Sequence, residues 1–311
     1  MSRPRIIFMG TPDFAVSSLE ACFDVGDVVA VVTQPDKPKG RGNTVTAPPV
    51  KELALSRGVP VLQPVKLRTP PFSEELRRFA PDVCVVTAYG RILPKDLLDL
   101  PAKGCVNVHG SLLPRFRGAA PIQWSIAHGD TETGVTLMVM DEGLDTGPML
   151  AMKRLPIAPD DTSATLYPKL AALGGELLRE SLPAYLRGEL KPVPQPSEGV
   201  VLAPIIEKDE GRLDFTRPAV ALERRLRAFT PWPGAFTTLG GKLLKVHRVR
   251  VARGQGAPGT VLSAGVDGIE VACGEGSLVL LEVQPEGKRV MKALDFLSGN
   301  KLAPGSQPFG A

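Results

Sequence analysis

Residues 105–150 read CVNVHGSLLPRFRGAAPIQWSIAHGDTETGVTLMVMDEGLDTGPML, and the rest of the chain is arranged around this stretch. It opens with a short apolar run typical of a strand. Asn107 and His109 stand two residues apart in that run, so their side chains point to the same side. A second apolar run, 135–140, leads into an acidic loop that carries Asp145. An amide, an imidazole and a carboxylate at neighbouring strand ends can stabilise an oxyanion and manage a proton.

Strand-like apolar runs alternate with helix-like segments from residue 5 to residue 109. The run at 83–87, VCVVT, is apolar throughout, as in strands buried within a parallel sheet. This alternation predicts an α/β fold with a Rossmann-like, mostly parallel sheet, in which ligands bind at the carboxyl ends of the strands. The turn after the first strand, GTPDFA at 10–15, lacks the GxGxxG fingerprint, so we expect no dinucleotide site there.

The length of 311 residues favours two domains over one. A helix with leucines at helical spacing ends near Gly188, and the proline-rich segment 189–204 is typical of an extended linker. Beyond it, short β-rich runs alternate with glycine-containing turns, which predicts a small, closed β-barrel of the OB kind. We therefore expect a catalytic domain over 1–188, a linker over 189–204 and an OB-like barrel domain over 205–311.

The composition is that of a soluble globular protein, with 43% hydrophobic and 23% charged residues. No apolar segment is long enough for a signal peptide or a membrane span. Four cysteines lie far apart without a CxxC pair, and we interpret them as buried, reduced thiols of a cytoplasmic protein. They are Cys22, Cys84, Cys105 and Cys273.

The net charge of +4 is unevenly distributed. Residues 1–200 carry 22 basic and 22 acidic side chains, whereas residues 201–311 carry 15 and 11. A basic module beside a neutral one indicates a polyanionic partner, although a well-solvated surface would look the same. The long loop at 34–51, QPDKPKGRGNTVTAPPVK, is also basic and rich in proline and glycine, which suits a loop that binds phosphates.

The residue types narrow the chemistry of the candidate site. A metal site is not expected, because His109 has no histidine or cysteine partner nearby. Ser111 lies close to His109, but no GxSxG elbow presents a serine as a nucleophile. What remains is a site that holds a carbonyl, stabilises its tetrahedral intermediate with an amide and an imidazolium, and uses a carboxylate to set the histidine charge. This fits direct acyl transfer between two bound substrates.

Five segments in order resemble the methionyl-tRNA formyltransferases, a family of folate-dependent formyltransferases: MGTPDFAV, VTQPDKPKGRG, NVHGSLLPRFRGAAPIQWSIAHGD, GLDTGPML and FTPWPGAF. The resemblance covers nearly the whole chain. It implies a Rossmann-like formyltransferase domain, a C-terminal OB-like tRNA-binding domain, and formyl transfer from 10-formyltetrahydrofolate to the methionine amine of initiator methionyl-tRNA. It also implies a monomer that needs no metal.

The resemblance assigns residues by position. It implies that Asn107, His109 and Asp145 are the catalytic trio. The folate-binding residues that it implies are Ser111, Leu112, Leu113, Pro114, Arg91, Ile92 and Leu93. For tRNA, we interpret as phosphate contacts Lys37, Lys39 and Arg41 in the basic loop and Lys208 beyond the linker, with further candidates at Arg224, Lys242, Lys245 and Arg248.

One segment departs from the family pattern. Where the family usually has a lysine-bearing run, this chain has APIIEKDEG, with Ile205 at the first lysine position and Lys208 at the second.

Two alternative functions also stay open. A formyltransferase acting on an amino sugar nucleotide would share the trio but would not require the basic loop. A non-catalytic nucleic-acid-binding relative is the other, and the intact trio argues against it.

Overall fold

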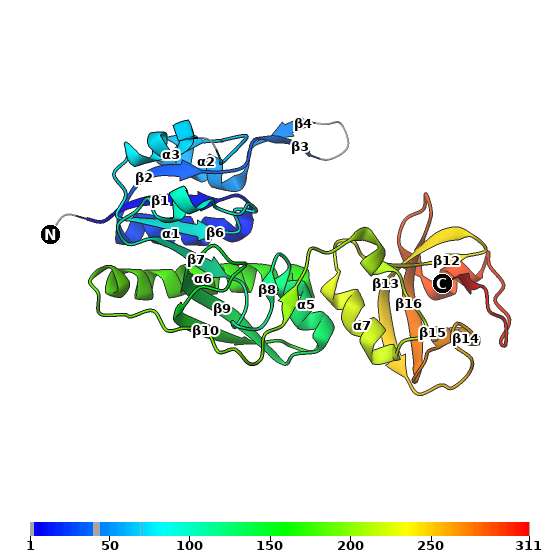
Figure 1. Cartoon of the computed structure of the whole chain (residues 1–311). Helices are drawn as coiled ribbons and strands as arrows, with labels where there is room; N and C mark the ends of the chain where they lie inside the picture. Colours follow the sequence, from blue (N-terminus) through cyan, green and yellow to red (C-terminus); the bar gives the residue numbers. More distant parts are fainter. Residues whose placement is uncertain (1–2, 40–43, 69, 311) are drawn as a thin grey trace. The chain divides into compact units, whose positions relative to one another are not determined.

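The computed structural model describes residues 3–39, 44–68 and 70–310, which form two compact units (Figure 1). The N-terminal unit contains the chain up to Pro121 together with Glu132–Pro156 and Leu166–Pro204, and the C-terminal unit contains Ile122–Thr131, Ile157–Thr165 and the chain from Ile205. These limits differ from boundaries at 188 and 204. Two short segments of the expected catalytic domain belong to the C-terminal unit, and the expected linker belongs to the N-terminal unit.

The N-terminal unit is built on a seven-stranded sheet in the order β10-β9-β7-β6-β1-β2-β5. Its strands are β1 (Arg5–Gly10), β2 (Asp27–Val32), β5 (Val61–Leu62), β6 (Val83–Thr87), β7 (Cys105–His109), β9 (Glu132–Val139) and β10 (Met149–Pro156). The first five pair in parallel, and β9 and β10 join as antiparallel strands. The predicted α/β fold with a mostly parallel sheet is confirmed. Helical crossovers between successive strands allow this parallel pairing.

Helices cover the sheet (Figure 1). They are α1 (Val16–Val25) after a short 3-10 turn (η1, Asp13–Ala15), α2 (Pro49–Ser56), α3 (Pro70–Arg77), α4 (Lys95–Leu98) and α6 (Ser163–Leu186). A Cβ on Gly174 of α6 would lie 2.8 Å from Val108 of β7, so this helix packs directly on the sheet. On the strands, Ile7 and Cys84 share one buried cluster with Leu76 of α3 and Leu97 of α4. Apolar side chains therefore hold helices against the strands.

The basic segment 34–51 differs from the loop that its composition predicts. It contains a small antiparallel ladder of β3 (Lys37–Lys39) and β4 (Thr44–Thr46), which Figure 1 shows away from the main sheet. A ladder is formed by backbone groups, so a polar, proline-containing sequence can adopt it without burying side chains. The described residues of the segment therefore include a pair of antiparallel strands, which its composition does not predict.

The expected linker is attached to the N-terminal unit. Met149 of β10 exchanges two backbone hydrogen bonds of 2.8 Å with Val193. Further on, β11 (Leu202–Ala203) pairs in parallel with β8 (Arg117–Gly118), which follows β7. Residues 189–204 are therefore extended, but they are hydrogen-bonded to the unit that contains the candidate site.

The C-terminal unit holds a curled, half-barrel antiparallel sheet in the order β14-β15-β16-β13-β12-β18, with β17 on β16. Its strands are β12 (Ala235–Leu239), β13 (Lys242–Ala252), β14 (Val261–Gly265), β15 (Gly268–Ala272), β16 (Ser277–Pro285), β17 (Met291–Lys292) and β18 (Phe309–Gly310). Strand pairing in the described residues does not close the barrel fully. Two backbone hydrogen bonds, Val261 to Ser306 (2.9 Å) and Gly305 to Val261 (2.8 Å), connect edge strand β14 to the chain that enters β18. The second domain is thus OB-like in its curled sheet.

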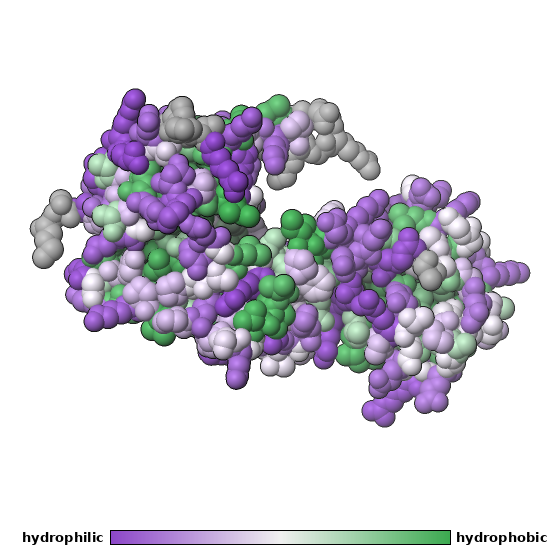
Figure 2. Space-filling model, in the orientation of Figure 1, coloured by the Kyte–Doolittle hydropathy of each residue, from purple (hydrophilic) through white to green (hydrophobic). Residues whose placement is uncertain are grey.

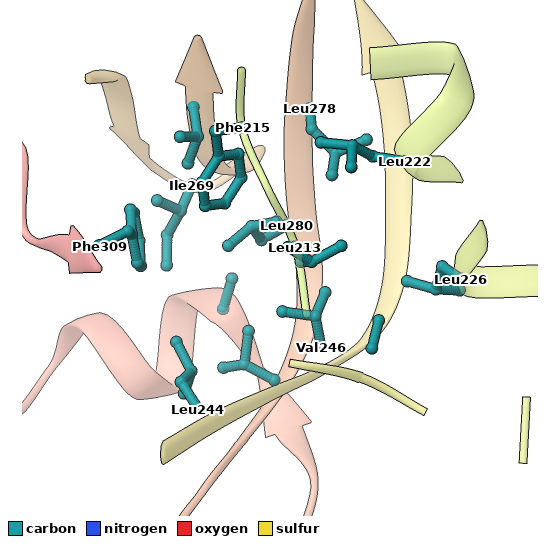
Figure 3. Close-up of a cluster of buried hydrophobic side chains, with 14 of the residues drawn as sticks. Leu213, Phe215, Leu222, Leu226, Leu244, Val246, Ile269, Leu278, Leu280 and Phe309 are labelled. Carbon is teal, nitrogen blue, oxygen red and sulfur yellow. The ribbon is translucent and has the colours of Figure 1, made fainter. Parts of the chain in front are cut away.

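The core of the C-terminal unit is apolar (Figure 3). Leu244 and Val246 of β13 point into it, and the intervening Lys245 is exposed, as expected for a half-buried strand. Leu222 and Leu226 of α7 pack against the same cluster. The helices and turns of this unit are α5 (Pro121–His128, of which Pro121 belongs to the N-terminal unit), η2 (Lys208–Gly211), α7 (Ala219–Ala228) and α8 (Ala293–Leu297).

Hydrophilic residues cover most of the molecular face drawn in Figure 2. Within residues 3–39, 44–68 and 70–310, no helix combines the length and the apolar character that a membrane span requires. The four cysteines are buried and not bonded to one another as disulfides. Burial raises the pKa of the Cys273 thiol to about 11 and raises the pKa of Cys22 still further, so neither thiol is a ready nucleophile.

Candidate active site

The structure brings Asn107, His109 and Asp145 together. Asn107 and His109 lie in the carboxyl-terminal half of β7, and Asp145 lies in the loop between β9 and β10. One carboxylate oxygen of Asp145, Oδ1, lies 3.5 Å from Asn107 Nδ2, and the other, Oδ2, lies 3.6 Å from His109 Nδ1. His109 is 6% exposed and the Asp145 side chain 16% exposed. Charges that are this far removed from water interact more strongly than surface charges.

Both ring nitrogens of His109 face oxygen atoms. Nε2 lies 2.9 Å from the backbone oxygen of Phe116, and Nδ1 faces the Asp145 carboxylate. A carbonyl oxygen can only accept a hydrogen bond, so Nε2 carries a hydrogen in this arrangement. The doubly protonated ring satisfies both contacts, whereas the neutral ring satisfies one. The geometry therefore suits an imidazolium.

Asp145 is held by several backbone and side-chain contacts. Its Oδ2 accepts a hydrogen bond of 2.9 Å from the backbone N–H of Gly118. Its backbone oxygen accepts one of 2.8 Å from Gln195 Nε2, which also donates to the Gly147 oxygen at 2.8 Å. The backbone φ of Asp145 is +52°, in the left-handed region that non-glycine residues rarely adopt. Sequence reasoning missed Gly118 and Gln195, because neither carries a local signal for the site.

The SLLP segment, 111–114, forms a buried turn next to the trio. Ser111 Oγ donates to the Arg115 oxygen at 2.6 Å, and the Ser111 oxygen accepts from Thr136 Oγ1 at 2.7 Å. The same threonine oxygen accepts from the Leu113 N–H at 3.2 Å. The Ser111 and Leu113 side chains are buried, whereas Leu112 and Pro114 are half-buried. Two of these four residues therefore shape the turn from inside and two have accessible surface.

The three side chains of the segment 91–93 lie in different environments. Arg91 Nη1 donates to the backbone oxygens of Pro64 and Val65, each at 3.0 Å, so its guanidinium binds the loop after β5. Leu93 is 3% exposed and belongs to the core, and Ile92 is 72% exposed. Of the three predicted folate residues, Ile92 has the most surface available for a ligand.

A cavity of about 610 Å³ lies beside the loop that follows β9. Its walls include Leu98, Val139 and Met140, and the carboxylates of Asp141 and Glu142 lie in the same lining. None of the predicted folate residues lines it. Sequence reasoning missed this cavity, because it forms only where α4 meets the end of β9.

The basic segment contains one exposed predicted lysine and one unexpected ion pair. Lys37 is exposed on β3, Lys39 ends that strand, and Arg41 lies outside the described residues. Lys51, at the end of the segment, binds both carboxylate oxygens of Asp36 at 2.9 and 2.7 Å. This hydrogen bonding lowers the pKa of Asp36. Lys51 therefore joins the two ends of the segment.

The basic residues of the C-terminal unit lie in two environments. Arg225 pairs with Glu210 and Arg227 with Glu223, so these charges of α7 are engaged within the unit. The third arginine of α7, Arg224, is half-buried beside Gly129.

The remaining predicted tRNA contacts are exposed: Lys208 in η2, and Lys242, Lys245 and Arg248 on β13. Arg248 also lies 3.4 Å from a carboxylate oxygen of Glu282. Ile205, at the position of the missing lysine, is 69% exposed. Among the predicted tRNA contacts of this unit, the exposed side chains are therefore on β13 and η2 rather than on α7.

Family comparisons place this fold and site in one class of protein. A model described as formyl transferase matches residues 4–182, and a model described as formyl transferase, C-terminal domain, matches residues 205–301. The two matches cover both parts of the chain. They define the class as the formyl transferases.

Curated relatives narrow the class. The chain is 86% identical over 311 residues to the methionyl-tRNA formyltransferase of Myxococcus xanthus (strain DK1622), with 100% of both chains covered. It is 54% identical over 306 residues to the methionyl-tRNA formyltransferase of Citrifermentans bemidjiense, covering 98% of this chain and 96% of the relative. The chain belongs to the methionyl-tRNA formyltransferase family.

Solved structures share the fold at low sequence identity. One is an N-formyltransferase from Helicobacter canadensis in complex with folinic acid and dTDP-3-aminofucose, with a TM-score of 0.68, 17% identity, and coverage of 92% of this chain and 100% of that chain. Another is HypX from Aquifex aeolicus in complex with tetrahydrofolic acid, with a TM-score of 0.60, 19% identity, and coverage of 97% and 48%. These likenesses concern the fold alone.

Proposed function

We propose that this chain transfers a formyl group from 10-formyltetrahydrofolate to the amino group of methionine on initiator methionyl-tRNA, for translation initiation. The observation that carries the proposal is the 86% identity, over the full length of both chains, to a methionyl-tRNA formyltransferase. The site agrees with it, because the Asp145 carboxylate lies 3.5 Å from the Asn107 amide nitrogen and 3.6 Å from the His109 ring.

The trio would act on the formyl carbonyl. The methionine amine attacks the formyl carbon, so no side chain has to act as a nucleophile. The amine then loses a proton, the bond between the formyl carbon and N10 of the folate breaks, and tetrahydrofolate leaves with a proton on N10. Asn107 Nδ2 would donate a hydrogen bond to the formyl oxygen as negative charge develops on it, and charged His109 would stabilise the same charge. Asp145 would hold both groups and favour the charged form of the imidazole through its carboxylate.

The hydrogen bond between His109 Nε2 and the Phe116 carbonyl limits how the ring can act. In the present arrangement His109 can stabilise the formyl oxygen through its charge. It can donate a hydrogen bond from Nε2 to that oxygen only if the formyl oxygen replaces the Phe116 carbonyl.

The formyl donor would bind next to the trio. We assign to it the accessible surfaces of Leu112, Pro114 and Ile92, with Ser111, Leu113, Arg91 and Leu93 supporting them from within the fold. The tetrahydrofolic acid in HypX, a protein of the same fold, supports a folate donor.

The tRNA would bind through basic side chains at its phosphates. We assign this role to Lys37 and Lys39 on β3, to Arg41 in the same basic segment, to Lys208 and, on β13, to Lys242, Lys245 and Arg248. Arg224 is a weaker candidate, because it is half-buried. The chain would act as a monomer in the cytoplasm, and no step requires a metal.

The test is product formation. Purified protein is incubated with 10-formyltetrahydrofolate and charged initiator tRNA, and formylmethionine is measured by mass spectrometry after the ester bond is hydrolysed. A parallel reaction contains a dTDP-amino sugar as the acceptor. We expect formylmethionine and no formylated sugar. A protein that formylates only the sugar, or neither acceptor, would overturn the proposal.

A further inference from the structure

We propose that Gln195 is a positioning residue that fixes the Asp145 loop for catalysis, an inference that rests on the proposed function. Gln195 lies in the proline-rich segment 189–204, far from the catalytic motifs in sequence. Its Nε2 donates to the backbone oxygens of Asp145 and Gly147, both at 2.8 Å. One side chain therefore holds the loop at Asp145 itself and two residues beyond it.

The orientation of the Gln195 amide is determined by its partners. Arg117 donates to Oε1 from Nε at 3.0 Å and from Nη2 at 2.7 Å, and a guanidinium has no acceptor. The two loop carbonyls have no donor, so they must face the amide nitrogen. Both donors and both acceptor positions of the glutamine are thereby filled. The cationic partner at Oε1 also polarises the amide and strengthens its N–H donors.

Asp145 needs such support. Its backbone φ of +52° is uncommon for a residue with a side chain, and surrounding contacts must maintain it. The strand β8 reaches Asp145 by two routes: Gly118 donates to the carboxylate at 2.9 Å, and Arg117 acts through Gln195 on the backbone. Side chain and backbone of Asp145 are thus held from the same short strand.

The expected consequence is a loss of turnover rather than of substrate binding. The hydrogen bonds of Gln195 described above join it to Arg117 and to the Asp145 loop, and none of these partners is assigned to folate or tRNA. A loosened loop would move the carboxylate relative to His109 and Asn107. A displacement of about 1 Å at a catalytic group can reduce the rate by about 10²-fold. We therefore expect a lower kcat with KM values close to those of the wild type.

The experiment compares Gln195→Glu and Gln195→Ala with Gln284→Ala as a matched control. Gln284 is also half-buried, and its Nε2 also donates to a backbone oxygen, that of Lys288 at 2.8 Å. Gln195→Glu keeps the size and the Arg117 partner but turns a carboxylate oxygen towards two carbonyls. We expect kcat to fall about 10-fold to 10²-fold in both Gln195 variants, with KM within about threefold for both substrates, and to stay unchanged in the control.

A double-mutant cycle separates positioning from general stability. If Gln195 acts through Asp145, Gln195→Glu should cause little further loss in an Asp145→Asn background. Full additivity in that background, or a wild-type kcat in Gln195→Glu, would overturn the inference. Both results are read only against a wild type that makes formylmethionyl-tRNA. An inactive wild type would overturn the proposed function instead.

Discussion

The carboxylate of Asp145 offers the sharpest test of the site, through the substitution Asp145→Asn. The change keeps the size of the side chain and removes its charge. At a separation of 3.6 Å, Asp145 and a charged His109 interact by about 5 kcal/mol at an effective dielectric constant of about 20. An asparagine dipole retains part of this. A loss of about 4 kcal/mol of transition-state stabilisation corresponds to a fall in kcat of about 10³-fold.

The fold should tolerate this substitution. An asparagine oxygen can still accept the Gly118 N–H, while its amide nitrogen would face the Asn107 amide, donor against donor. We expect a loss of about 1 kcal/mol of stability, which is a few degrees in Tm. Single-turnover formylation at saturating folate gives the rate, and differential scanning fluorimetry gives Tm.

A matched carboxylate provides the control. Asp82 accepts the Arg5 N–H at 2.7 Å at the amino ends of the parallel strands, opposite the ends that carry the trio. Asp82→Asn should leave the rate within about twofold. If Asp145→Asn retained a rate within about tenfold of wild type, the electrostatic reasoning on the trio would be refuted.

Three further outcomes are expected. Lys37→Ala should raise KM for methionyl-tRNA and reduce the salt dependence of tRNA binding by the equivalent of about one phosphate contact, with kcat unchanged at saturating tRNA. An unaltered KM at low salt would show that this exposed lysine does not contribute to tRNA binding. Gly118→Ala should lower stability by about 2 kcal/mol or more and impair turnover, because φ is +126° and the new Cβ would lie 2.5 Å from the Ala203 oxygen; an unchanged Tm would contradict this. The hydrogen bond from Lys51 lowers the pKa of Asp36 below its ordinary value of 3.8. The ionised carboxylate therefore stabilises the folded protein above pH 3.8, and this stabilisation is lost as the pH falls through the lowered pKa of the folded state. Lys51→Met should therefore begin acid unfolding at a higher pH than the wild type in circular dichroism, and coincident acid transitions would count against the ion pair.

The grouping of Asn107 and His109 could be predicted because its signal is local: alternation along β7 places both side chains on one side. The approach of Asp145 depends on tertiary structure, because β9 runs antiparallel to β7 and the loop between β9 and β10 returns to these two residues. The basic segment was recognised from composition, but its pair of antiparallel strands was not. Backbone pairing between β3 and β4 leaves little trace in a sequence rich in proline and glycine.

The sequence by itself determined the α/β class and the family and singled out Asn107, His109 and Asp145 as candidates, because strand periodicity and motif spacing depend on neighbours along the chain. The tertiary structure decided how the trio is supported. Gln195 lies 50 residues from Asp145 in sequence, in a segment that reads as a linker, and its hydrogen bonds exist only because that segment packs against β8 and the loop after β9. Such contacts join residues with no common periodicity. Physical apposition in the fold, rather than any local pattern, makes them part of the site.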